Sequence, residues 1–147
     1  MNAVAAYLYV GLGSALGGMA RYGVGLAVAE RFGESFPWGT LLINVTGSFV
    51  IGLVGTVTAP FGLRPASAEM RLFAMAGLCG GFTTFSAFSI QTLQMLREGE
   101  AWRAVAYAVS SVLACIAGAA LGQYLAAGLG GDTTHGSSIG DTAGFRT

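Results

Sequence analysis

The chain has 147 residues, of which 54% are hydrophobic and 10% charged, and this composition is typical of a membrane protein rather than of a soluble domain. Its seven basic residues, all arginine, balance seven acidic residues. Because no basic surface is available to attract phosphate, nucleic acid is excluded as a partner.

Four long apolar runs predict four membrane-spanning helices in one domain. Only Arg21 interrupts the run 1–29, and no charged residue interrupts the runs 35–63, 72–96 and 104–131. Each run exceeds the roughly 20 residues that a spanning helix needs. We therefore expect an all-α integral membrane protein with a four-helix domain over residues 1–127. Residues 128–147, where Gly, Asp, Thr and Ser dominate, are expected to form a disordered tail.

The first run carries small residues and one arginine. Gly13 and Gly17 have the GxxxG spacing that lets two helices approach closely. Arg21 follows near the end of the run. A guanidinium at that depth either extends to the membrane surface or supplies positive charge to a water-filled vestibule, and the residues alone leave both roles open.

The second run begins at Pro37-Trp38 and carries a polar stripe. Thr40, Asn44 and Ser48 are four residues apart, so they share one face of a helix and turn away from lipid. An Asn amide in hydrocarbon must be hydrogen-bonded. It serves either as a clamp to another helix or as a donor to a permeating anion. Pro65 then makes residues 61–71 a loop.

The third run contains poor helix-forming sequence at its centre. Gly80-Gly81 is followed by Thr83-Thr84, so we expect the helix to break here. Backbone groups freed by a break in hydrocarbon need another partner, which suggests a ligand or a second subunit. Beyond the break, Phe85 and Phe88 are three residues apart and would project from one helix face.

The fourth run places Tyr107 and Ser111 four residues apart on one face, and Gly118 and Gly122 repeat the GxxxG spacing. No Asp, Glu or His lies within any of the four runs. This removes the usual general acids and bases as well as a proton relay. We therefore expect the protein not to be an enzyme.

Three stretches resemble one known family. The string Gly80-Gly81-Phe82-Thr83-Thr84-Phe85-Ser86-Ala87-Phe88 closely resembles the signature of the Fluc (CrcB) fluoride channels, which are small, four-helical and dimeric. Residues 17–22 and 39–49 resemble the end of that family's first helix and its second-helix motif. The resemblance covers roughly residues 11–122. It implies a passive channel that exports F⁻ across the bacterial inner membrane and relieves fluoride toxicity.

The resemblance also implies roles for individual residues. Phe85 and Phe88 would line the pore with their partly positive ring edges, and Asn44 would donate a hydrogen bond to fluoride. Thr40, Tyr107 and Ser111 would also line the path of the ion, and Arg21 would lie in the vestibule that leads to it.

A central Na⁺, shared by two subunits, is implied at the backbone carbonyls of Gly80 and Thr83, where hard oxygen ligands suit this ion. Two positions depart from the family's pattern. Ala87 stands where a Thr is usual, and Gln91 stands where a Glu is common.

Three other functions fit a small four-helix membrane protein less well. A dual-topology multidrug exporter and an F⁻/H⁺ antiporter both need an intramembrane carboxylate, which the four runs lack. A non-transporting scaffold would explain the small residues but not the polar stripe of the second run.

Loop charges predict no fixed orientation in the membrane. With four spans, Arg64 and Arg71 lie on one side and Arg31, Arg97 and Arg103 on the other, a difference of one. We therefore expect insertion in both orientations and an antiparallel homodimer with two-fold symmetry.

Overall fold

The computed structural model describes residues 2–131, and all regular elements in this range are helices. In chain order they are α1 (Ala3–Phe32), α2 (Trp38–Val57), α3 (Ala68–Arg71), the π-helical stretch η1 (Leu72–Cys79), α4 (Gly80–Phe82), α5 (Phe85–Arg97) and α6 (Ala101–Gly131). The stretches that are long and apolar enough to cross a membrane are Ala3–Phe32, Trp38–Val57, Ala68–Arg97 and Ala101–Leu129. The prediction of an all-α protein with four membrane-spanning helices is therefore confirmed.

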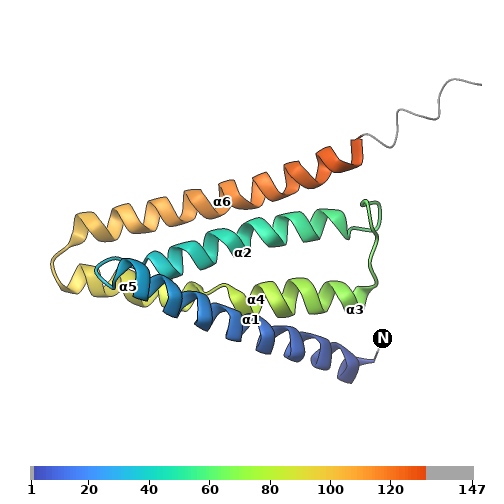
Figure 1. Ribbon diagram of the computed structural model, residues 1–147, viewed down its shortest axis with the longest axis horizontal. Helices are drawn as coiled ribbons and strands as arrows, with labels where there is room; N and C mark the ends of the chain where they lie inside the picture. The colour runs from blue at the N-terminus through green and yellow to red at the C-terminus, as the bar shows by residue number, and fades with distance from the viewer. Residues whose placement is uncertain (1, 132–147) are drawn as a thin grey trace, which may run out of the picture.

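The four spans run in alternating directions along the long axis of the molecule (Figure 1). α2 packs mainly against α6, and α1 packs mainly against η1 and α4. The start of α1, the α2–α3 connection and the end of α6 lie at one end of the molecule (Figure 1). The α1–α2 and α5–α6 connections lie together at the opposite end, where the larger of two cavities is found.

Glycines bring the backbones of these helix pairs into contact. Gly13 and Gly17 are buried, and a Cβ atom at Gly77 would lie 2.9 Å from the Cα atom of Gly13. Between α6 and α2, a Cβ atom at Gly118 would lie 3.0 Å from the carbonyl oxygen of Val45. The close approach expected from the GxxxG spacings in the first and fourth runs is therefore confirmed.

Three of the four spans extend beyond their charge-free runs, whereas α2 lies within the run 35–63. α3 begins at Ala68, inside the predicted loop 61–71, because the Ser67 hydroxyl caps it by accepting a hydrogen bond from the Met70 N–H. α6 runs from Ala101 to Gly131, so residues 128–131 are helical and not part of a disordered tail. Residues 132–147, the rest of the predicted tail, lie outside the described residues. Water at the membrane surface solvates charged side chains, so a charge does not mark the end of a helix.

Candidate functional site

An extended segment of two residues separates α4 from α5 and meets the side chain of Asn44 on α2. Thr83 has φ −77° and ψ 159°, and Thr84 has φ −149° and ψ 107°. Asn44 Oδ1 accepts a hydrogen bond from the Thr84 N–H at 2.7 Å, and Asn44 Nδ2 donates to the Thr84 carbonyl oxygen at 3.0 Å. Asn44 therefore supplies both partners that a helix would otherwise give to the Thr84 backbone.

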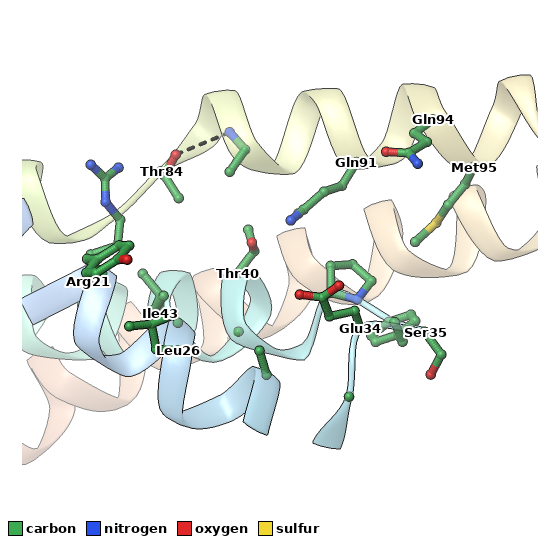
Figure 2. A pocket seen from close by; sticks show the side chains of 18 of the residues that line it. Arg21, Leu26, Glu34, Ser35, Thr40, Ile43, Thr84, Gln91, Gln94 and Met95 are labelled. Carbon is green, nitrogen blue, oxygen red and sulfur yellow. Dashed lines mark hydrogen bonds between the residues drawn. The ribbon is translucent and has the colours of Figure 1, made fainter. Parts of the chain in front are cut away.

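The Asn44 amide is thus a clamp between helices, one of the two roles that the sequence left open. An Asn amide carries two N–H donors, and the Thr84 carbonyl uses one of them. The second N–H is left for another acceptor. On the other side of the segment, the Thr84 hydroxyl caps α5 by accepting a hydrogen bond from the Ala87 N–H at 3.2 Å (Figure 2).

A cavity of about 770 Å³, called here the vestibule, lies at the end of the molecule that holds the α1–α2 and α5–α6 connections. Arg21 and Thr84 lie toward one end of it, and Glu34 and Gln94 lie toward the other (Figure 2). Arg21 is partly buried, and in the described part of the chain the only ion pair among the lining residues joins Arg103 to Glu100. The Arg21 guanidinium therefore forms no ion pair with a described carboxylate, although Glu34 and Glu98 line the same vestibule.

A second cavity of about 380 Å³, called here the groove, lies between α2, α5 and α6. Its lining residues include seven that the sequence had singled out, namely Asn44, Ser48, Gly80, Thr83, Phe85, Phe88 and Ser111. No charged side chain lines it. The groove therefore offers an ion neutral hydrogen-bond donors within apolar walls, a combination that lets an anion bind without being held by a fixed cation.

The Ser111 hydroxyl is the buried donor of this groove that has no protein partner. Ser111 is only 5% exposed, and its Oγ makes no hydrogen bond with any described residue. Buried polar groups in folded proteins nearly always have a partner, and leaving one unpaired costs about 1–3 kcal/mol. The Ser111 hydroxyl is therefore positioned to donate to a bound ion or to water.

Three aromatic rings form a continuous series beside the groove. Phe85 is 77% exposed, and its ring centroid lies 5.3 Å from that of Phe88. The Phe88 ring in turn lies 5.3 Å from that of Tyr107, which is fully buried. The edges of such rings carry partial positive charge. Two of the three, Phe85 and Phe88, line the groove itself.

The remaining predicted residues lie elsewhere. Thr40 and Arg21 line the vestibule, and Tyr107 lines neither cavity. Instead, Phe36 packs edge-on against Tyr107 with centroids 5.4 Å apart, and the Tyr107 hydroxyl donates to Gln91 Oε1 at 3.0 Å. This contact could not be predicted from the sequence, because Gln91 and Tyr107 are 16 residues apart on different helices.

Residues 8–123 match the family described as CrcB-like protein, Camphor Resistance (CrcB). The chain belongs to the CrcB family. A relative from Opitutus terrae is 50% identical over 123 residues, which cover 84% of this chain and 93% of the relative. A relative from Methylocella silvestris is 52% identical over 120 residues, covering 82% and 92%, and one from Gluconobacter oxydans is 52% identical over 123 residues, covering 82% and 84%.

Each of these three CrcB relatives bears the name fluoride-specific ion channel FluC. The matched range includes all the site residues predicted from the sequence, from Arg21 to Ser111. The family is one of ion channels and not of enzymes, in agreement with the prediction from the sequence.

Proposed function

We propose that this protein is a fluoride-selective ion channel that lets F⁻ leave the bacterial cell passively and so relieves fluoride toxicity. The observation that carries the proposal is the 50–52% identity, over most of both chains, to relatives named fluoride-specific ion channels. The donor set of the groove supports it. Fluoride is a small, strongly hydrated anion, and hydroxyl, amide and ring-edge donors replace part of its water without a cation that would hold it too tightly.

In this proposal the route begins in the vestibule, where Arg21 attracts the anion and Thr40 lies beside its path. It continues through the groove, where Asn44, Ser111 and the ring edges of Phe85 and Phe88 are the ligands. No carboxylate lines the groove, so passage needs no proton exchange with the protein. For this reason the F⁻/H⁺ antiporter and the dual-topology exporter are not favoured.

A second copy of the chain would complete the route. Phe85 is 77% exposed although it lines the groove, so the groove opens to the surface of the single chain. A ring that lines an ion path needs to be covered on its open side. We propose that an antiparallel homodimer in the plasma membrane provides this cover, with the two copies inserted in opposite orientations.

A sodium ion at the centre of that dimer would be held by backbone oxygens of Gly80 and Thr83. In an unbroken helix, the Gly80 carbonyl would accept a hydrogen bond from the Thr84 N–H, but that N–H donates to Asn44. The Gly80 carbonyl oxygen is therefore left for another partner, and Gly80 is exposed. Oxygen atoms are the ligands that a hard cation such as Na⁺ prefers. When bound, the ion would supply positive charge and join the two chains.

Fluoride efflux from liposomes loaded with KF tests the proposed function. We expect the purified protein to release F⁻ far faster than Cl⁻ and without a proton gradient. Release that depends strictly on proton movement would point to an antiporter. The absence of selective release, from protein that is folded and dimeric, would point to a scaffold.

A further inference from the structure

Two hydrogen-bonded pairs of residues lie where the vestibule and the groove approach each other. Asn44 lines the groove and Thr84 lines the vestibule, and two hydrogen bonds join them. Gln91 also lines the vestibule, and its partner Tyr107 packs against Phe88, which lines the groove. No residue lines both cavities. Each pair therefore joins the lining of the vestibule to the groove or to a ring that lines it.

The two pairs differ in how easily they can open. Breaking the Asn44–Thr84 pair would leave a backbone N–H and a backbone carbonyl without partners inside the protein, which is costly. The Tyr107–Gln91 hydrogen bond joins two side chains and can be exchanged without any change in the backbone. The Gln91 side chain extends from α5 into the vestibule, where water can replace Tyr107 as its partner (Figure 2).

The Tyr107 ring itself is held in place. It is fully buried, and its ring is packed between those of Phe36 and Phe88, with centroid distances of 5.4 Å and 5.3 Å. Close packing of this kind resists movement of the ring. The hydroxyl hydrogen, in contrast, only has to rotate about the C–O bond to point to a different acceptor.

We propose that the Tyr107–Gln91 hydrogen bond is the latch between the vestibule and the groove, and that an entering fluoride ion opens it by taking over the Tyr107 hydroxyl from Gln91. This inference rests on the proposed function. Gln91 is then a positioning residue, because it acts by keeping the Tyr107 donor occupied until an anion arrives.

The exchange is favourable because the anion is the better acceptor. Hydrogen bonds to an ionised partner are shorter and roughly twice as strong as those between neutral groups. The Gln91 oxygen that loses Tyr107 can be hydrated in the vestibule, so no group is left without a partner. Ser111, four residues further along α6 on the same face, has a free buried hydroxyl that can receive the ion next.

Replacement of Gln91 by methionine tests the latch, since methionine has a similar length and shape but no amide oxygen. In the wild-type protein, fluoride must compete with Gln91 for the Tyr107 hydroxyl. Without that competitor, we expect the fluoride concentration that gives half-maximal efflux to fall about five-fold, the factor that corresponds to one neutral hydrogen bond. Gln91→Leu is a second variant with the same expected direction if Gln91→Met does not fold.

A double-mutant cycle separates the latch from a general effect on packing. In a Tyr107→Phe background there is no hydroxyl to release, so adding Gln91→Met should leave the half-maximal concentration of that background unchanged. Gln123→Met is the matched control, because Gln123 is an exposed glutamine on α6 that lines neither cavity. We expect Gln123→Met to behave as wild type.

Two results would overturn the latch while leaving the fluoride channel intact. One is a half-maximal concentration that stays the same or rises in the folded Gln91 variants. The other is an equal five-fold fall in the presence and absence of the Tyr107 hydroxyl. If wild-type protein releases no fluoride at all, the proposed function fails, and the latch fails with it.

Discussion

Asn44 and Ser111 illustrate two kinds of polar residue in one groove. Asn44 is already engaged, since both ends of its amide bond the Thr84 backbone. Ser111 is buried and has no partner among the described residues. A polar group that stabilises the fold should have its hydrogen-bond partners within the protein, whereas a polar group that binds a ligand has to keep a hydrogen bond free for that ligand. By this criterion Asn44 has a structural role, and in the proposed channel the Ser111 hydroxyl is the group left available to the ion.

Replacing Ser111 by alanine should therefore leave the protein as stable as before, or more stable by about 1 kcal/mol, because it removes an unpaired buried hydroxyl. Fluoride efflux should nevertheless fall several-fold, since one donor of the groove is lost. Thermal unfolding in detergent and liposome efflux measure the two effects.

The neighbouring Ser110 supplies the control for this experiment. Its hydroxyl donates a hydrogen bond to the Tyr107 carbonyl oxygen at 3.2 Å. Ser110→Ala therefore removes a hydroxyl that already has a partner in the protein, and it should leave efflux unchanged. If Ser111→Ala lowers the unfolding temperature and keeps wild-type efflux, the Ser111 hydroxyl is structural, and the groove does not use it.

At the scale of helices, small residues decide which elements can be neighbours. α1 approaches η1 and α4 so closely that a side chain at Gly17 would meet the backbone of Leu78 and lie 2.8 Å from the Phe82 nitrogen. Phe82 is the last residue of α4 before the extended Thr83–Thr84 segment. α1 therefore packs directly against the residue that precedes the extended Thr83–Thr84 segment.

A methyl group at Gly17 should force α1 away from α4. Overpacking of this kind costs about 1–3 kcal/mol, so we expect Gly17→Ala to lower the unfolding temperature by several degrees and to reduce efflux. Gly18→Ala changes the adjacent residue, where nothing lies within 4 Å of an added Cβ, and should unfold as wild type does. Equal stability of the two variants would mean that close contact between α1 and α4 is not needed.

The sequence predicted those features of the fold that depend on the residues along a single helix. Apolar runs and GxxxG spacings depend on local composition and period, so the four spans and their close contacts were predictable. The conformation of η1 was not, because a π-helical stretch depends on packing around it rather than on propensity. Nor was the burial of Tyr107, whose neighbours Phe36, Phe88 and Gln91 come from three separate parts of the chain.

For the whole molecule, the alternating spans put the start of α1 and the end of α6 at the same end (Figure 1). Arginine residues near the membrane favour neither orientation, because two lie on one side and three on the other. A reporter fused after Thr147 should therefore give comparable signals from the inside and the outside of the membrane. A signal from one side only would show a fixed orientation and would rule out the antiparallel dimer.

The spans also differ in length, and α2 is the shortest of the four. Its 20 residues cover about 30 Å, close to the thickness of the hydrocarbon core, whereas α6 with 31 residues covers about 46 Å. Near one end of α2, Arg71 donates to the Gly55 carbonyl oxygen at 3.1 Å and to the Thr58 hydroxyl at 2.8 Å. α2 therefore has little freedom to lengthen or shift.

Since Asn44 lies on this helix, bilayer thickness should act directly on the ion path. Lipids with long acyl chains would draw the ends of α2 into hydrocarbon and slow fluoride efflux, while α1 and α6 would adapt by changing tilt.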